Sequence, residues 1–434
     1  MAYAKDGYPV EAASKIGHLK IVGNQIIRRV VESFEAFEPT TPSLIAQNVR
    51  HVDPTIPCGL RHVVTIDGGQ TLVPNQLRRE KTVAFIQVAA CLLKLADLER
   101  MRREPMMDPR DVGRIFRDRT WTNAAVLPLS GVRVAGQTVR ATIRETVHHT
   151  LLTAGLIDTL SYLVSRQWDP NYPMPGDGSP RFKCWSCEGE IVIPKSSLGF
   201  PCPHCADPHR LVDYLEIGRE SPDEWSREDT ATALRNVMET LKLFHLVRPY
   251  LSKPDALAKI LFIKDGPLLL RAALSRLIDP IRALIEHIKS SGLAFNLVGV
   301  EKTGDLVAHI DEFQHQLSEP GDCFIPSVRY LIEEVAGKPF GPDYRNRVSY
   351  GAKVLARVGP QHLLALNIPT GEFELEPDPI KLIGYETIVR ALGELVSYRY
   401  PNALLPLMLA NDAASISQRP SGPILQQFVD ELLH

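Results

Sequence analysis

Apolar residues recur at helical spacing in several parts of the chain. In residues 11–37, Ile16, Ile26 and Phe37 belong to one such stripe, which predicts a long amphipathic helix. This helix either packs on the core or serves in docking or dimerisation, and the pattern leaves both open. Further helical patterns lie at about 80–101, 138–166, 226–250, 279–290, 323–335, 381–398 and 402–414.

Short β-rich runs alternate with these helices. Val63, Val64 and Ile66 form one run that leads into Asp67, Gly68 and Gly69, so we expect a strand that stops in an acidic turn. Residues 258–268 repeat this pattern and end in Asp265 and Gly266, and strands are also expected within 295–305, 347–358 and 362–369. Strands that alternate with helices indicate an α/β layer architecture.

The amino-acid composition and net charge indicate which broad class of protein this chain belongs to. The 434 residues are 44% hydrophobic and 23% charged, which is typical of a globular protein with a large core. The formal charge is −2, so nucleic-acid binding would need local basic patches. The amino terminus lacks a signal-peptide pattern, and the apolar stretch 83–93 is far shorter than the ~20 residues that span a bilayer. We therefore expect a cytoplasmic protein with no membrane segment.

Four of the seven cysteines form a metal-binding pattern. Cys184 and Cys187 make one CxxC turn, Cys202 and Cys205 make another, and fourteen residues separate the two turns. This spacing predicts a small zinc ribbon with a structural four-thiolate zinc site. His204 is an alternative ligand. The surface of the ribbon either contacts a nucleic-acid backbone or is simply solvated, and the residues considered for such contact are Lys183, Trp185, Lys195, His209 and Arg210.

Carboxylates follow two of the expected strands. Neighbouring strands lie about 4.8 Å apart, so Asp67 and Asp265 can converge on a hard cation such as Mg²⁺ or Mn²⁺. Two such aspartates and a glutamate can hold the ions that activate water for phosphodiester cleavage. The alternative is that each Asp-Gly pair only forms a turn.

These motifs together resemble the NurA family of DNA repair nucleases. The resemblance rests on IDGGQT at 66–71, a later helix with Glu239, LFIKDGPLLL at 261–270, NLVGVEKTGD at 296–305 and YPNALLPLMLANDAASIS near the carboxyl end. It implies an α/β, RNase H-like core with a mixed sheet flanked by helices. It also implies a Mn²⁺- or Mg²⁺-dependent deoxyribonuclease that works as a homodimer with a hexameric HerA-like ATPase.

The resemblance assigns roles to individual residues. Asp67 and Asp265 match the metal-binding aspartates, and Glu239 is chosen as the intervening glutamate, with Glu220 and Glu224 as competing candidates. Lys302 matches the basic residue that follows the next strand. The family pattern leads to a histidine where this chain has Asn411 and Asp412, so Asn411 is a weaker ligand or Asp412 takes the metal-facing role. This departure favours reduced or altered activity.

The domain organisation expected from these patterns has four parts. They are an amino-terminal helix and connector at 1–55, the first half of the NurA-like core at 56–170, a zinc-ribbon insert at 171–215 and the second half of the core at 216–434. No GxxxxGK[ST] motif is present, so ATP hydrolysis would have to come from the partner. The expected function is DNA end processing or antiviral defence, and the alternative is a non-catalytic adaptor that binds DNA, the ATPase or both.

Overall fold

A computed structural model of the chain divides it into two units, Met1–Thr41 and Pro42–His434. The residues described are 23–33, 48–75, 81–103, 119–172, 179–195, 197–219, 227–302, 304–310, 315–397, 402–416 and 421–432. In the first unit, helix α2 spans Gln25–Glu32 and begins at Asn24, whose side chain accepts hydrogen bonds from the backbone of the first turn. Within the described residues the helix expected at 11–37 is therefore only eight residues long, because it begins after Asn24 and ends before Ser33, and residues 11–22 and 34–37 lie outside the described residues.

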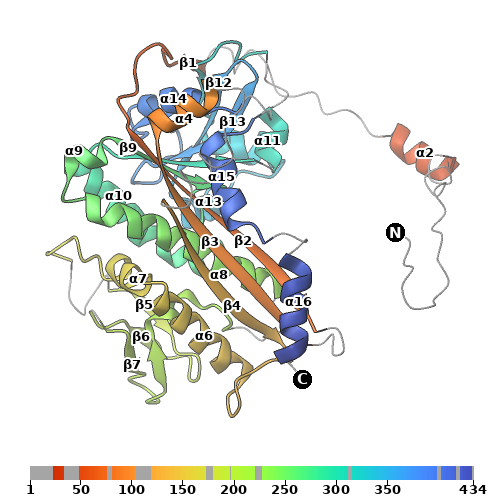
Figure 1. Cartoon of the computed structure of the whole chain (residues 1–434), viewed down its shortest axis with the longest axis vertical. Helices are drawn as coiled ribbons and strands as arrows, with labels where there is room; N and C mark the ends of the chain where they lie inside the picture. Colours follow the sequence, from red (N-terminus) through yellow and green to blue (C-terminus); the bar gives the residue numbers. More distant parts are fainter. Residues whose placement is uncertain are drawn as a thin grey trace. The chain divides into compact units, whose positions relative to one another are not determined.

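The second unit is built on a nine-stranded mixed sheet in the order β1-β11-β12-β13-β10-β9-β2-β3-β4 (Figure 1). The strands are β1 (Val49–His51), β2 (His62–Pro74), β3 (Thr82–Lys94), β4 (Thr120–Ser130), β9 (Ile260–Asp265), β10 (Asn296–Glu301), β11 (Asp322–Phe324), β12 (Ala352–Gly359) and β13 (His362–Ile368). β9 runs parallel to both β2 and β10, whereas β2, β3 and β4 form an antiparallel meander. This large mixed sheet confirms the expected α/β fold class.

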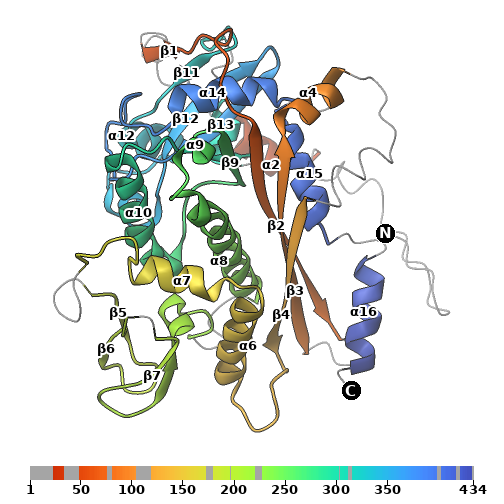
Figure 2. The same ribbon diagram turned by 60° about the vertical axis from the view of Figure 1, so that its left-hand side comes forward.

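Helices cover both faces of this sheet (Figure 2). Helices α6 (Val139–Thr153), α7 (Ile157–Val164), α8 (Arg227–Val247) and α10 (Ile278–Ser290) share one apolar core with Val64 and Ile66 of β2. Helices α14 (Tyr385–Glu394) and α15 (Leu405–Ala414) share the opposite core with Val63. Because successive side chains of a strand point to opposite faces, β2 contributes to both cores.

The second unit also contains further helices and helical turns among the described residues. They are α4 (Leu95–Arg103), η1 (Leu211–Leu215), η2 (Arg248–Tyr250), α9 (Pro254–Leu257), η3 (Ala272–Leu277), α11 (Asp305–Ile310), α12 (Val328–Tyr330), the π-helix η5 (Leu331–Val335), α13 (Asp343–Val348) and α16 (Ser421–Leu432). α16 packs beside the far end of the β2–β3 hairpin, where the rings of Phe428 and Phe85 lie 6.3 Å apart.

Two sequence-based expectations about the sheet are wrong. The acidic turn at Asp67, Gly68 and Gly69 is instead continuous strand, and β2 pairs with β3 as far as Pro74. Residues 82–94 of the expected helix at 80–101 form β3, and only 95–103 are helical. β3 is buried on both faces, so its apolar run lacks the alternation that distinguishes a strand from a helix.

Most other expected elements are confirmed. The pattern at 138–166 gives α6 and α7, which are separated at Gly155, where φ is +68°. The pattern at 226–250 gives α8, and the strands expected at 258–268, 295–305 and 362–369 give β9, β10 and β13. The region 323–335 was expected to be helical throughout, but it begins in β11. β1, β4 and β11 were not anticipated.

The cysteine segment forms two small hairpins. β5 (Arg181–Lys183) pairs with β6 (Glu190–Val192), and β7 (Gly199–Pro201) pairs with β8 (Pro208–Arg210). β6 lies between the two CxxC turns. Apolar side chains of these hairpins, including Phe182 and Ile191, belong to the same core as α6 and α8. The hairpins are therefore packed against the α/β body.

In the part of the chain that the structure describes, no helix combines the length and hydropathy needed to cross a membrane.

Candidate active site and cysteine cluster

Gly68 and Gly69 allow helices to approach β2 closely from both sides. A Cβ on Gly68 would lie 2.5 Å from Glu239 Oε1 of α8, and a Cβ on Gly69 would lie 2.4 Å from the backbone oxygen of Ala414 in α15. Neither contact is possible for a real side chain. The two glycines are therefore explained by close packing of α8 and α15.

Asp67 and Asp265 share one face of the sheet at the point where β9 ends. Thr65 of β2 contacts α15 through the backbone oxygen of Pro406, and Asp67 follows two residues later on the same face. The last β2–β9 pair is Ile66 with Lys264, so β2 continues beyond Asp67 without β9 beside it. A cavity of about 820 Å³ lies here, lined in part by Asp67 and Asp265.

The pKa of the Asp67 carboxyl group is shifted because this side chain is buried close to other acidic side chains. Burial, the charge of Asp265 and the charge of Glu239 raise the pKa of Asp67 to about 7, although Lys302 opposes the shift. Lys302 Nζ lies 2.9 Å from Asp265 Oδ1. Asp67 Oδ1 accepts a hydrogen bond from the Gly68 N–H, whereas the buried Oδ2 has no partner among the described residues. A buried, unpartnered carboxylate oxygen beside a second aspartate is a donor set that fits a hard divalent cation.

Glu239 reaches the same cavity from the α8 face. Its carboxylate lies 2.8 Å from Lys264 Nζ and 3.4 Å from Arg235 Nε. Burial is the largest single influence and lowers the pKa of Lys264, but the charge and hydrogen bond of Glu239, together with Tyr350 and Asp265, raise this pKa overall. The sequence interpretation missed Lys264, although a lysine in the apolar strand before Asp265 is itself a sign of a buried ion pair.

The raised pKa of Asp67 predicts a pH-dependent stability of the metal-free protein. The folded-state pKa of about 7 lies above the unfolded value of about 3.9, so the folded chain binds more protons and loses stability as the pH rises from about 4 to 7. Asp67→Asn should remove this loss, which is on the order of 4 kcal/mol at most. At pH 8 without metal, chemical denaturation should therefore show Asp67→Asn to be more stable than the wild type.

The exposed Asp412 provides the control for this measurement. Asp412→Asn should leave both the stability and its pH slope unchanged. An Asp67→Asn protein with the wild-type pH slope would contradict the electrostatic account of Asp67.

The remaining residues expected at the site lie on α15 or outside the described residues. Asn411 and Asp412 are both exposed, and neither lines the cavity. Gln87 of β3 donates a hydrogen bond to the Ala413 backbone oxygen, so this end of α15 lies against β3. The competing candidates Glu220 and Glu224 lie outside the described residues.

The four expected cysteines converge on one point. All four Sγ atoms lie within 4.8 Å of one another, with 3.7 Å between Cys184 and Cys205 and 3.7 Å between Cys187 and Cys202. A tetrahedral zinc ion with Zn–S bonds of about 2.3 Å requires S–S separations of about 3.8 Å. The donor set and its spacing therefore fit zinc. Among the described residues, Cys184, Asp207 and His209 form a second such cluster, whereas Asp67, Asp265 and Glu239 do not.

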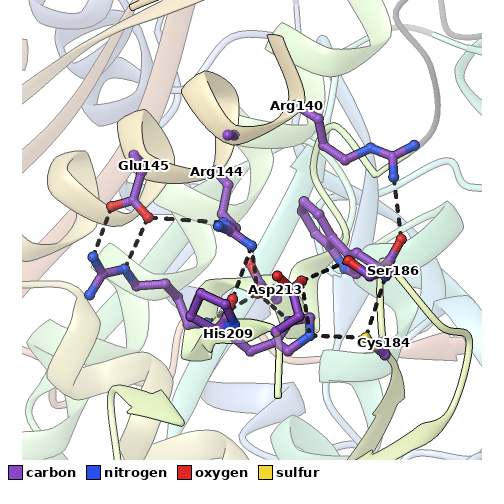
Figure 3. Close-up of polar contacts among 12 residues, drawn as sticks. Arg140, Arg144, Glu145, Cys184, Ser186, His209 and Asp213 are labelled. Carbon is purple, nitrogen blue, oxygen red and sulfur yellow. Dashed lines mark hydrogen bonds and ion pairs between the residues drawn. The ribbon is translucent and has the colours of Figure 1, made fainter. Parts of the chain in front are cut away.

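The ring of His209 approaches the sulfur of Cys184 (Figure 3), whereas His204 reaches a cysteine sulfur only through its backbone N–H. His209 Nε2 lies 3.2 Å from Cys184 Sγ and its Nδ1 lies 2.8 Å from Asp213 Oδ2, whereas His204 contacts the backbone oxygen of Glu190. Burial disfavours the charged form of His209, but Asp213 and Cys184 outweigh it and raise the pKa. The i, i+4 spacing of His209 and Asp213 after the last cysteine was the available sequence signal.

Some of the ribbon residues that were considered for nucleic-acid contact are buried or contact α6. His209 is 2% exposed and Trp185 is 7% exposed, so both are buried. The Arg144 guanidinium of α6 lies 5.9 Å from the centre of the Trp185 ring, and Arg210 forms an ion pair with Glu145 of α6. Trp185 and Arg210 thus attach the ribbon to α6, whereas the other two residues considered, Lys183 and Lys195, are exposed.

Comparison with known proteins adds little to this geometry. No protein-family model and no curated protein matches the chain. Two solved structures of endonuclease V from Ciona intestinalis, in complex with DNA containing an inosine followed by a ribo-adenosine, align at 8% and 9% identity. They cover 93% and 88% of this chain and 100% and 95% of those chains, each with a TM-score of 0.26. Similarity this slight carries no argument, so the site is interpreted from its own residues.

Proposed function

We propose that the chain is a divalent-metal-dependent DNA nuclease of the NurA type. The observation that carries the proposal is the pairing of Asp67 and Asp265 beside a cavity, with a buried Asp67 oxygen that has no partner among the described residues. Parallel strands β2 and β9 bring the two carboxylates together, so their proximity follows from the sheet. A buried pair of acids is costly unless a cation or a proton neutralises it.

In this proposal Asp67 and Asp265 bind Mn²⁺ or Mg²⁺, and Glu239 completes the ligand set from α8. A metal held there supplies activation of water and stabilisation of the leaving oxygen in phosphodiester hydrolysis. Lys302 orients Asp265 through their ion pair and offers positive charge to a phosphate. Lys264 and Arg235 hold the Glu239 carboxylate in place. Asn411 stands in the sequence where the family pattern has a histidine.

The proposed partners follow the family resemblance. The chain acts as a homodimer with a hexameric HerA-like ATPase, which supplies the ATP hydrolysis for which this chain has no P-loop motif. The substrate is DNA with accessible ends, processed during repair or in defence against foreign DNA.

The second candidate function is a non-catalytic adaptor with the same fold. The observation that favours it is the exposed Asn411 where the family pattern has a histidine. An adaptor would bind DNA or the ATPase without consuming the DNA.

A cleavage assay of the purified full chain separates the two functions. We expect the wild type to degrade end-labelled single- and double-stranded DNA with Mn²⁺ or Mg²⁺, faster with the HerA-like ATPase present, and not with EDTA. Gel-shift measurements under the same conditions report binding. Binding without cleavage, even with the ATPase and either metal, would reject the nuclease and favour the adaptor.

A further inference from the structure

Part of the wall of the carboxylate cavity comes from outside the sheet and α8. Leu215 at the end of η1 and Ile217 just after it line the same cavity as Asp67 and Asp265. Residues 272–274 of η3 also line it. Whatever holds η1 and η3 therefore sets the shape of the space beside the two aspartates. We refer to Leu215, Ile217 and residues 272–274 as the η1–η3 wall.

A buried chain of contacts joins the cysteine cluster to η1 (Figure 3). His209 lies between Cys184 Sγ at 3.2 Å and Asp213 Oδ2 at 2.8 Å, and the side chains of His209 and Asp213 are fully buried. Asp213 belongs to η1 and also accepts a hydrogen bond from the backbone N–H of Arg210, where η1 begins. A metal that fixes Cys184 thus fixes the group that anchors η1.

A second chain of contacts joins the same CxxC turn, at Cys187, to η3. Glu188 directly follows Cys187, and its carboxylate lies 2.7 Å from the Arg219 guanidinium. Arg219 also pairs with Glu216, and Glu216 lies 3.0 Å from Arg276 of η3. In addition, the Tyr214 hydroxyl of η1 donates to the Arg276 backbone oxygen at 3.0 Å. The two helices are therefore joined to each other as well as to the Cys184–Cys187 turn.

We propose that the cysteine cluster, acting through His209 and Arg219, positions the η1–η3 wall of the carboxylate cavity. The zinc ribbon then supports the site on the α/β core and is more than an independent appendage. His209 and Arg219 are positioning residues, because each touches the wall or its anchors and not the reacting atoms. Any effect of these residues on DNA cleavage rests on the proposed nuclease function, whereas their effect on the position of the η1–η3 wall does not.

Backbone amide hydrogen exchange of the full, zinc-loaded chain tests the positioning directly. His209→Phe removes both contacts but keeps a ring beside Phe182, whose ring centre lies 5.4 Å away. We expect exchange in residues 211–219 and 272–277 to become at least about tenfold faster, the effect of losing a hydrogen bond to a charged group. Exchange in α14, on the opposite face, should not change. His209→Gln, which keeps a hydrogen-bonding side chain, should restore part of the protection.

The matched control is His204→Phe, which changes the other histidine of the ribbon but breaks no link to η1. It should leave exchange in both segments at the wild-type rate. If His209→Phe loses zinc or does not fold, Arg219→Ala provides the same test, because Arg219 contacts no cysteine. Its control is Arg181→Ala, which breaks the Arg181–Glu190 ion pair inside the ribbon. Zinc content measured at one ion per chain confirms that the cluster is intact in each variant.

Steady-state cleavage adds a second readout if the wild type is active. His209→Phe and Arg219→Ala should raise KM by about tenfold with a smaller change in kcat, because they move the wall and not the carboxylates. Wild-type exchange rates in residues 211–219 and 272–277 for both variants would overturn the proposal, whatever the cleavage result. Absence of cleavage by the wild type would instead reject the nuclease function, and the exchange data would still decide whether the ribbon positions the wall.

Discussion

The double variant Asp67→Asn, Asp265→Asn is expected to reduce Mn²⁺-dependent DNA cleavage by roughly 10³-fold or more. The two carboxylates lie on adjacent parallel strands and face the same cavity, so either loss disrupts the proposed metal site. Each single variant should have nearly the effect of the double variant, because a site that has lost one ligand has little activity left to lose. Initial rates measured at equal protein concentration, with the ATPase present, give the comparison.

Asp412→Asn is the matched control for the carboxylate variants, since Asp412 is an exposed aspartate on α15 outside the cavity. It should cleave at the wild-type rate. Circular dichroism should show that all variants keep the fold. Glu239→Gln tests the third proposed ligand and should behave like the aspartate variants. Wild-type cleavage by the double variant would exclude a metal site at Asp67 and Asp265.

Loss of zinc from the cysteine cluster is the second change for which a large effect is expected. Cys184 is fully buried and belongs to the core shared with α6 and α8, whereas Cys205 is exposed. Cys184→Ser should abolish zinc binding and lower the free energy of unfolding by about 4 kcal/mol or more, a loss characteristic of removing a structural metal. Cys205→Ser should also lose zinc but should disturb the core less.

Metal analysis and calorimetry measure these two effects. Trp185 fluorescence reports the local change, because this buried indole lies against Arg144 and should become solvated when the ribbon opens. Cys58→Ser, which changes a half-buried cysteine outside the cluster, should retain zinc and the wild-type stability. Protein purified without chelator that contains far less than one zinc per chain would contradict the assignment.

The helices that the sequence predicted well alternate between buried and exposed positions, whereas β9, β10 and β13 are buried along most of their length but were recognisable as strands because they are only six or seven residues long. α8 and α10 have one face in the core, so their helical period is visible in the chain. β3 is buried on both faces and its near-continuous apolar run was mistaken for a helix. β2 was expected to stop at Asp67, because the sequence does not show that β3 supplies hydrogen-bonding partners as far as Pro74. In these strands tertiary pairing overrides local turn propensity.

The sequence by itself determined the composition of both candidate sites. The CxxC spacing predicted a four-cysteine cluster, and strand context singled out Asp67 and Asp265, because both signals depend on residues close together in the chain. Only the tertiary structure decided that Glu239 of α8 lies against Gly68 of β2. It also decided that Lys264 pairs with Glu239 while Lys302 pairs with Asp265. Finally, it decided that the ring of His209, and not that of His204, contacts a cysteine sulfur. These contacts join segments that are distant in sequence or depend on the direction of a side chain. Packing of α8, α15 and the ribbon against the sheet fixes them, and no local pattern encodes that packing.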